Sequence, residues 1–510
     1  MKSKFNKTLE KLLKREDLWF RCTLVIIGLI YLLLKINEYI QLREVGFATA
    51  DSYAMIVKSI TFMEEGFSVL GTRPFLMPVL IGFVHKYLIT DIFVATYLLT
   101  SIIFVASVFA LDYLGKKIFK SKFSRLVLLS LVLFSKYFLI FSSDAEKAPF
   151  VVGFFVIGLL LWTKGRENGR MIFIVLAGLL FGLSFMSHLT ALLLFVSFGV
   201  GYLVEVISMK KKLFSKEIFV LAGVVLIFGV SFYFVRKYIV KPDMSTSDVS
   251  LVTTAVQYNL LNSFSKIGLM SFIHGITFYM NRYVLLVGVL GFIYVLFSKK
   301  IFRNSQVLYL ASWVSVTFFL FSIQYTSFSH GSRYPYYVIF PMLVFVAVFI
   351  DWVASYFKSS RMTTLFQMLV VVWILVTYVD LNVSDFRYRW QPHKELCEYF
   401  RDEGEGYVDN MMYVSWPSIT LYCFDGNSGV ADQNTNIGWN RSRIDLLNDK
   451  YIIENKLIYL LVDYTGNDYS DTNERILKNV SSLQEVTPVF EEEFTDDRGN
   501  FRVILYSLNY

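Results

Sequence analysis

The sequence predicts an α-helical membrane protein that crosses the bilayer many times and carries a small polar domain at its C-terminal end. Hydrophobic residues make up 55% of the 510-residue chain. Apolar runs long enough to cross a bilayer recur from about residue 18 to residue 380. Basic residues gather in short loops between these runs, as orientation signals do. The net charge of +8 therefore needs no nucleic acid as partner.

The first apolar run is expected to be a retained helix. It follows a tail rich in Lys and Arg and lacks a small-residue cleavage site, unlike a signal peptide. The tail places the N-terminus in the cytoplasm, and later basic clusters should share that side. These clusters lie at 116–125, 164–170, 210–216, 299–303 and 358–361, and one exception, 236–241, opens a long loop where the rule is weaker.

Segment 75–88 decides the number of spans. It is apolar but short, and it contains His85 and Lys86. If it crossed the membrane, the cluster 116–125 and every later cluster would change sides, so we expect it to lie at the outer interface or to re-enter. About eleven transmembrane helices remain, together with interfacial helices. They are expected near 19–40, 92–114, 126–142, 149–163, 171–187, 189–207, 217–235, 283–298, 306–325, 336–355 and 362–380.

Two domains are expected, a transmembrane domain at 1–380 and, from the side on which the basic loops place it, an extracytoplasmic α/β domain at 381–510. Strand-like runs in the second domain occupy 406–415, 457–463 and 501–508, and 496–500 has the composition of a hairpin turn. If this region is extracytoplasmic, Cys397 and Cys423 could form a disulfide, and two free thiols are the alternative.

Asp51 is the first candidate for chemistry on the outer face. It precedes an expected amphipathic helix at 53–65, on which Ile56, Ile60 and Met63 share one face. Asp is a favoured helix N-cap, which is the structural interpretation. A carboxylate at the membrane surface can also take a proton from an acceptor hydroxyl. Both interpretations stay open.

Two arginines are candidates for binding phosphate. Arg73 opens the short apolar segment, and Arg333 with Tyr334 precedes a span that contains Pro341. A guanidinium at headgroup depth can grip a phosphate through two hydrogen bonds. The alternative is that both side chains only anchor helix ends at the interface.

The remaining candidates are an acidic pair and a histidine. Asp144 and Glu146 stand two residues apart in a short loop, where carboxylates can converge on a divalent cation such as Mg²⁺ or Mn²⁺, or on a substrate proton. His188 is the strongly polar residue of a long apolar stretch, a position that favours function in a membrane protein. A solvated loop and a capped hairpin are the respective alternatives.

Taken together, these residues resemble a known superfamily in their order and placement. They are Asp51-Ser52-Tyr53 after the first span, Arg73-Pro74 opening an apolar segment, Asp144 and Glu146 in the next outer loop, a Gly-Leu-x-Phe hairpin at 182–188, and Arg333-Tyr334 before Pro341. This arrangement resembles the GT-C glycosyltransferases, especially protein O-mannosyltransferases and lipid A aminoarabinose transferases.

Some positions depart from the family pattern. Ser52 stands where a second acid is frequent, and His188 stands where a lysine is common. The Trp-Trp-Asp-Tyr-Gly motif of oligosaccharyltransferases is absent, which argues against that branch.

The resemblance implies an inverting transferase in a cell membrane that takes its sugar from a polyprenyl or dolichyl phosphate and works on the extracytoplasmic face. Asp51 would be the base, while Arg73, His188 and Arg333 with Tyr334 would hold the donor phosphate. Asp144 and Glu146 would bind acceptor, sugar or metal, and no cofactor is certain. The acceptor would be a lipid, a glycan or a protein.

Two other classes of function remain as alternatives. A transporter or lipid flippase places ionisable groups near mid-bilayer and shows paired halves. The expected spans are nearly free of interior charge, with Lys35, Asp112 and Lys136 towards helix ends, and no halves match. A non-catalytic membrane scaffold is the third class, but it leaves the charged residues of the outer face unexplained.

Overall fold

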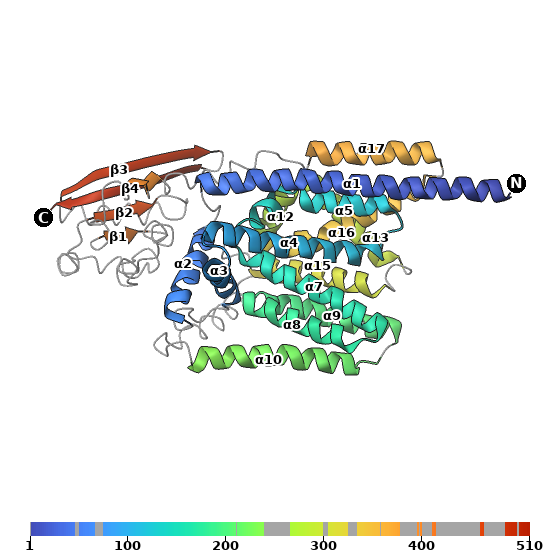
Figure 1. The fold of residues 1–510 in the computed structure, drawn as a ribbon, viewed down its shortest axis with the longest axis horizontal. Helices are drawn as coiled ribbons and strands as arrows, with labels where there is room; N and C mark the ends of the chain where they lie inside the picture. The colour runs from blue at the N-terminus through green and yellow to red at the C-terminus, as the bar shows by residue number, and fades with distance from the viewer. Residues whose placement is uncertain are drawn as a thin grey trace.

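The computed structural model shows a bundle of long helices with a small β-sheet beyond one end (Figure 1). It describes residues 2–45, 50–66, 75–210, 212–238, 266–298, 304–324, 334–357, 359–377, 395–396, 398–399, 411–414, 459–463, 485–496 and 499–509. The helices are α1 Lys2–Val45, α2 Ala50–Glu65, α3 Leu76–Tyr87, α4 Ile92–Lys116, α5 Lys122–Leu133, α6 Lys136–Phe141, α7 Lys147–Asn168, α8 Met171–Ser187, α9 Ala191–Met209, α10 Lys216–Tyr238, α12 Lys266–Met280, α13 Arg282–Phe297, α15 Ser305–Gln324, α16 Tyr334–Ala354 and α17 Ser360–Thr377.

Seven helices of the described chain are long and apolar enough to cross a membrane, in α1, α4, α7, α9, α10, α15 and α16. Shorter apolar helices lie in α3, α8, α13 and α17. The prediction of a multi-spanning helical membrane protein is therefore confirmed. The total of about eleven spans stays a prediction, because the length of the shorter helices alone does not show that they cross the membrane.

The apolar run at 126–142, expected to be one helix, forms two. α5 ends at Leu133 and α6 begins at Lys136. Ser135 separates them as the N-cap of α6, and its hydroxyl accepts a hydrogen bond from the Phe138 amide at 3.4 Å. A serine satisfies amide groups at a helix start, so the chain can begin a new helix inside a continuous apolar run.

The centre of the bundle is occupied by α7 and α16, whereas α1 and α10 lie at its edge. In the most apolar window of α16, 78% of the residues are buried, against 11% in α1. Close packing needs small residues in places. At Gly291 of α13, a Cβ atom would lie 1.9 Å from the Phe345 carbonyl oxygen of α16, so only glycine permits this approach.

The C-terminal region forms a four-stranded mixed sheet with strand order β1-β2-β4-β3. The strands are β1 Met411–Val414, β2 Tyr459–Asp463, β3 Glu485–Asp496 and β4 Gly499–Asn509. β1 pairs with β2 in parallel, and the other neighbours are antiparallel. Asp496 pairs with Gly499, which confirms the expected hairpin. β3 was not among the predicted strands.

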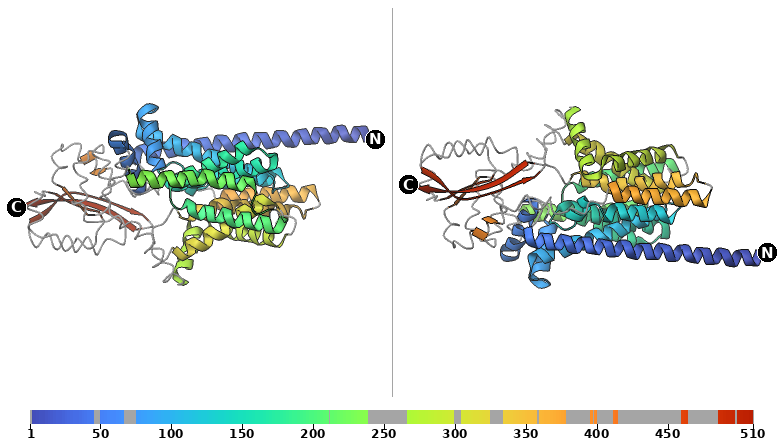
Figure 2. Two further views of the ribbon diagram at one scale, coloured as in Figure 1. Left: turned by 90° about the horizontal axis from the view of Figure 1, so that it is seen from below. Right: turned by 90° about the horizontal axis from the view of Figure 1, so that it is seen from above.

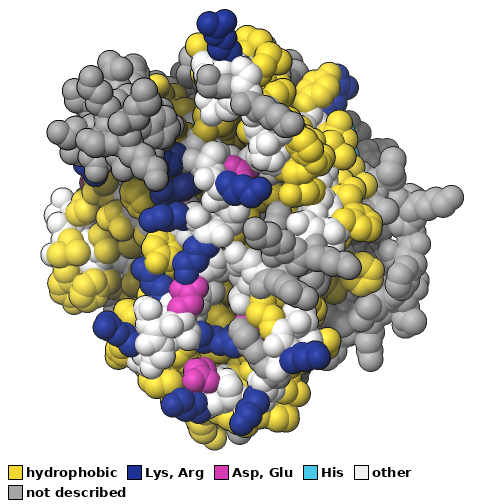
Figure 3. Space-filling view, turned by 90° about the vertical axis from the view of Figure 1, so that its right-hand side faces the viewer, with side chains coloured by type: hydrophobic (Ala, Val, Ile, Leu, Met, Phe, Trp, Pro, Cys, Tyr) yellow, Lys and Arg dark blue, Asp and Glu magenta, His cyan; other side chains and the backbone are white. Residues whose placement is uncertain are grey.

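The two ends of the bundle differ. The N-terminus of α1 and the sheet lie at opposite ends, and α2 and α3 lie at the end nearer the sheet (Figures 1 and 2). Lys and Arg side chains gather at the other end (Figure 3). We call the end with residues 116–125 and 164–170 the basic end, and the end with α2, α3 and the sheet the sheet end. The basic residues of 116–125 and 164–170 therefore share one end, as predicted from the loops.

Candidate functional site

Asp51 lies in the first turn of α2, because this helix begins at Ala50. The expected helix at 53–65 is thus confirmed and starts three residues earlier than predicted. A carboxylate in the first turn is favoured by the helix dipole, although the Asp51 side chain itself lies outside the described residues. Ile56 is fully buried, so the apolar face of α2 packs onto the bundle.

The acidic loop, residues Ser142–Glu146, lies at the same end and is buried. Asp144 is 0% exposed and Glu146 is 3% exposed, which contradicts the alternative of a solvated loop. Ala145 between them packs in one apolar cluster with Met55 and Ile56 of α2. Helix α2, which carries Asp51 in its first turn, and the loop with the acidic pair therefore contribute to the same apolar cluster.

A buried lysine that the sequence analysis did not select holds this loop. The ammonium of Lys35 in α1 donates to the Ser143 hydroxyl at 2.6 Å and to the Ser142 hydroxyl and carbonyl at 3.3 Å each. Only 4% of Lys35 is exposed. Helix α1 also buries Glu38, one turn further on.

A signal for this pair was present in the sequence. Lys35 and Glu38 stand three residues apart in an apolar run, so they share one face of the helix. An ionisable residue inside a membrane span is a functional candidate by default.

His188 links two helices at the sheet end. Its Nδ1 atom accepts the Thr190 amide at 3.2 Å and lies 3.0 Å from the Thr190 hydroxyl. That hydroxyl lies 2.7 Å from the Tyr337 hydroxyl in the first turn of α16. His188 is therefore connected to the turn that begins with Tyr334, and its contact with Thr190 agrees with a capped hairpin.

The arginines Arg73 and Arg333 lie outside the described residues, but the residues near them are placed. Phe75, two positions after Arg73, packs with Met186, two positions before His188. Tyr334, next to Arg333, has its ring 5.1 Å from that of Phe321 in α15. The structure thus brings together the segment after Arg73, the His188 hairpin and the start of α16.

A group of aromatic side chains joins the short helix α6 to this region, and the sequence analysis missed it. The Tyr137 ring lies 4.4 Å from Tyr279 of α12 and 5.9 Å from Tyr336 of α16. These residues come from three helices far apart in sequence. Their meeting depends on the break after α5, which no pattern in the sequence indicated.

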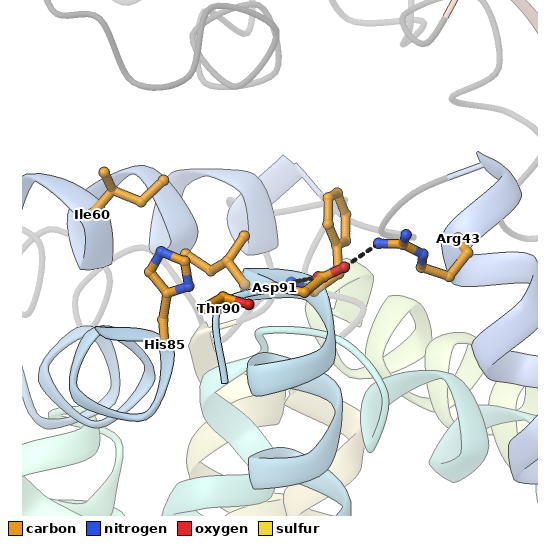
Figure 4. Close-up of a pocket in the computed structure, with 7 residues that line it drawn as sticks. Arg43, Ile60, His85, Thr90 and Asp91 are labelled. Carbon is orange, nitrogen blue, oxygen red and sulfur yellow. Dashed lines mark hydrogen bonds and ion pairs between the residues drawn. The ribbon is translucent and has the colours of Figure 1, made fainter. Parts of the chain in front are cut away.

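A cavity of about 530 Å³ opens beside α2 and α3. Figure 4 shows Arg43 from the end of α1 directed towards Asp91, with His85 of α3 across the cavity. Asp91 forms an ion pair with Arg43, and its other oxygen caps α4 by accepting the Phe93 amide at 2.9 Å. Asp91 therefore has a structural task at this position.

The fit of a divalent metal can be tested on the acidic loop. Within the part of the chain that the structure describes, no three His, Cys, Asp or Glu side chains gather closely enough to hold a metal ion. Asp144 and Glu146 supply two carboxylates, but the Lys35 ammonium lies beside the adjoining Ser143. Among the described residues, the two carboxylates therefore have no third ligand beside them and do not by themselves make a metal centre.

No protein family model and no curated protein matches the chain. Solved structures do match it. One is the oligosaccharyltransferase of Archaeoglobus fulgidus in complex with zinc and sulfate, at 14% identity and a TM-score of 0.50, over 94% of this chain and 72% of that one. Another is ArnT from Cupriavidus metallidurans bound to undecaprenyl phosphate, at 10% identity and a TM-score of 0.52, over 94% and 97%.

The chain has the GT-C fold. Because both identities are low, the likeness establishes the fold, and the resemblance drawn from the sequence is confirmed at that level. The coverage includes most of this chain in both cases, so the GT-C likeness extends beyond a few helices.

Proposed function

We propose that this protein is a membrane glycosyltransferase that moves a sugar from a polyprenyl or dolichyl phosphate to an acceptor. The observation that supports it most is that α2 joins two candidate regions of a GT-C fold. It shares one apolar cluster with Ala145 of the acidic loop and another with Met186, just before His188. ArnT, which shares the fold, was solved bound to undecaprenyl phosphate. That structure favours a lipid phosphate as the carrier of the donor sugar.

The proposed orientation follows from the distribution of charge. Basic loops remain in the cytoplasm, and the basic end of the bundle would therefore face that side. The sheet end would then face the extracytoplasmic side, with residues 1–380 as the catalytic membrane domain and 381–510 as an extracytoplasmic domain. Donor lipid would reach the site sideways from the bilayer, and the acceptor would come from outside the cell.

The donor phosphate would be bound by Arg73, Arg333 and His188, with Tyr334 beside Arg333. Because Nδ1 of His188 accepts the Thr190 amide, the neutral ring keeps its proton on Nε2, a donor suited to a phosphate oxygen. Cationic groups around the phosphate stabilise the negative charge that grows on it as the sugar leaves.

In the proposed reaction, the Asp51 carboxylate takes the proton of the acceptor hydroxyl as the hydroxyl oxygen attacks the anomeric carbon. The bond from that carbon to the phosphate oxygen breaks, and its electron pair leaves with polyprenyl phosphate. Asp144 and Glu146 would orient acceptor or sugar hydroxyls. A single displacement inverts the anomeric carbon, so retained configuration in the product would contradict this route.

The first test is the thermal unfolding of the detergent-purified protein with and without a polyprenyl phosphate. Ligand at about 100 times its dissociation constant adds about 2.7 kcal/mol to the free energy of unfolding, so a clear rise in melting temperature is expected. Arg73→Ala and Arg333→Ala should lose it. Arg170→Ala, an arginine at the basic end, is the matched control and should keep it.

The same experiment separates the alternatives. No shift in an intact folded protein would contradict the proposed function and favour a scaffold. A lipid flippase would also bind the lipid, so release of polyprenyl phosphate from a lipid-linked sugar is measured alongside. An enzyme cleaves the bond between the sugar and the phosphate in the presence of acceptor, whereas a flippase moves the lipid-linked sugar intact.

A further inference from the structure

The cavity beside α2 and α3 lies where four helices meet. The described residues that line it are Arg43 in the last turn of α1, Ile60 of α2, His85 of α3, and Thr90, Asp91, Ile92 and Phe93 at the start of α4. At Gly82 in α3, a Cβ atom would lie 2.7 Å from the Ser59 carbonyl oxygen of α2, so the two helices pack closely beside the cavity. Its volume of about 530 Å³ is within the range of small-ligand sites, about 300–1,000 Å³.

The charged groups of the cavity are matched to each other. Arg43 and Asp91 form an ion pair, and they are the guanidinium and the carboxylate among the described lining residues. A guanidinium has several N–H donors, and a carboxylate has several acceptor positions. Both side chains stay partly exposed, at 49% and 33%. The pair therefore offers donors and acceptors together to a ligand, and a ligand without net charge leaves the pair intact.

His85 adds a polar atom that the protein does not use. Its Nδ1 atom is buried and has no hydrogen-bond partner among the described residues. Figure 4 shows the His85 ring and the Asp91 carboxylate on opposite sides of Thr90. A buried polar atom without a partner is costly. A hydroxyl group can both donate and accept, so a ligand hydroxyl satisfies this nitrogen in either tautomer of the ring.

The rest of the lining is apolar and comes from Ile60, Ile92 and Phe93. Apolar walls with a few polar groups are typical of ligand sites. A sugar ring carries hydroxyl groups around its edge and C–H bonds on its faces, so it matches both parts of this lining. A phosphate ion has no apolar face, and the Asp91 carboxylate repels it. The lining therefore favours an uncharged sugar over an anion.

The cavity lies on another side of α2 from the residues proposed for the donor phosphate. Phe62 of α2 packs in the cluster of Phe75 and Met186, which are two positions from Arg73 and His188. Ile60 instead lines the cavity, and two positions along a helix differ by about 200° around its axis. The donor sugar is attached to the phosphate, so a sugar in the cavity belongs to the other substrate.

We propose that this cavity binds an uncharged sugar unit of the acceptor, away from the hydroxyl that reacts. Arg43 and Asp91 bind hydroxyl groups on one edge of the sugar, His85 and Thr90 bind others, and Phe93 packs against a C–H face. Binding at such a remote unit serves to orient the acceptor. The inference deepens the proposed function and rests on it for the assignment to the acceptor, whereas the binding of sugar is independent of it.

The first part of the test is saturation-transfer NMR on the protein in an amine-oxide detergent, which has no sugar head group. The probes are the methyl glycosides of glucose, galactose, mannose and N-acetylglucosamine. At least one should show saturation of its ring protons and a dissociation constant that can be measured by titration. No binding of any of the four to the folded protein would overturn the inference.

Variants then locate the binding. Asp91→Asn keeps the cap of α4, because Asn caps as well as Asp, and His85→Phe keeps a planar ring. Each should weaken binding of the glycoside about tenfold or more. Lys86→Met is the matched control, because Lys86 neighbours His85 in α3 but donates to the Met63 carbonyl at 3.3 Å and does not line the cavity. Unchanged affinity in both Asp91→Asn and His85→Phe would overturn the site.

The second part tests the class and the source of the ligand by competition. Inorganic phosphate in large excess should not displace the glycoside from wild type, and displacement would contradict an uncharged ligand. The diacylglycerol glycoside of the sugar that binds is then added in phosphatidylcholine nanodiscs. Displacement would assign the site to a sugar on a membrane lipid, and no displacement would assign it to a soluble glycan.

The third part separates this inference from the proposed function. Polyprenyl phosphate should raise the melting temperature of Asp91→Asn as it does that of wild type, and it should not displace the glycoside. Displacement would place the cavity in the donor site and overturn the assignment to the acceptor. Glycoside binding without any effect of polyprenyl phosphate would remove the proposed function and leave the sugar site standing. The lipid effect without glycoside binding would do the reverse.

Discussion

The two ends of the bundle hold buried charge in different ways. At the basic end, Glu205 is 1% exposed, and its two oxygens meet the Arg166 guanidinium at 2.6 Å, the Tyr309 hydroxyl at 2.6 Å and the Ser305 hydroxyl at 2.8 Å. Asp112 likewise receives two hydrogen bonds from Arg125, at 2.6 Å and 3.0 Å. Opposite charges are matched in these networks, which fix the helix ends.

At the sheet end, the buried cation is held by serine oxygens, and the acidic pair is carried by a loop. The contacts of Lys35 with Ser142 and Ser143 fix the position of its ammonium group against the loop. A matched ion pair serves stability, whereas a buried ionisable group in a membrane helix is a candidate for function. In the proposed function, the basic end therefore serves structure and the sheet end serves chemistry.

The largest expected effect is at Asp51. In the first turn of α2, Asn keeps the size of the side chain and loses only a helix-dipole interaction of about 0.3–1 kcal/mol, so Asp51→Asn should still fold while losing the base. General-base catalysis contributes about 10²- to 10⁴-fold, and turnover should fall by that factor with normal expression and only a small change in melting temperature. The measurement is donor consumption by purified protein at equal concentration. Full activity in Asp51→Asn would mean that Asp51 only stabilises the start of α2. The proposed catalytic role of the sheet end would then lose its base.

Sequence patterns predicted the membrane helices and the separation of charge because both depend on local composition. Segments 92–114 and 171–187 were placed within a few residues by their apolar runs. The strand β3 was missed because Glu491, Glu492 and Glu493 break the alternation of apolar residues. A register shift between Pro488 and Phe490 breaks it further.

The candidate site was predictable only in its parts. Asp144 and His188 stand out in the sequence as polar residues in apolar surroundings. The residues that contact them in the fold cannot be identified in this way. Thr190 contacts Tyr337, 147 positions away in the sequence, and Lys35 contacts Ser143, 108 positions away. Such pairs are set by helix packing, which periodicity in one segment does not encode.

The next effect tests the structural half of the comparison at Glu205. Glu205→Ala leaves the Arg166 guanidinium without its carboxylate in a part-buried position. Breaking a buried pair in this way costs about 3–5 kcal/mol, so the melting temperature should fall while turnover per folded molecule stays the same. Thermal unfolding and donor consumption are measured on the same sample.

The control replaces both partners, with Arg166→Met and Glu205→Leu together. Because apolar residues of similar volume remove the desolvation cost as well, the double variant should regain much of the lost stability. A loss of turnover at unchanged stability in Glu205→Ala would mean that the basic end also takes part in chemistry.

The smallest effect concerns a third arrangement, in which the carboxylate of Glu492 in strand β3 lies beside that of Glu395. Burial raises the pKa of Glu492 in β3, and the neighbouring Glu395 raises it further by repulsion and by a hydrogen bond. Since the folded pKa lies above the unfolded one, this group's contribution to stability is present at acidic pH and is lost as pH rises through the raised value. At neutral pH the ionised pair opposes folding.

Glu492→Gln should therefore raise the stability of the sheet at neutral pH, and the gain should shrink as the pH falls towards the ordinary range of a glutamate. Amide hydrogen exchange in β3 and β4 of the full-length protein, compared at pH 5 and pH 7.5, measures it locally. Glu491→Gln is the matched control, because Glu491 accepts a hydrogen bond from Arg502 at 2.7 Å and its loss should give no gain. Equal protection in wild type and Glu492→Gln at both pH values would show that the two carboxylates do not repel in solution. Interactions between charged side chains would then affect stability inside the bundle but not in the more exposed sheet.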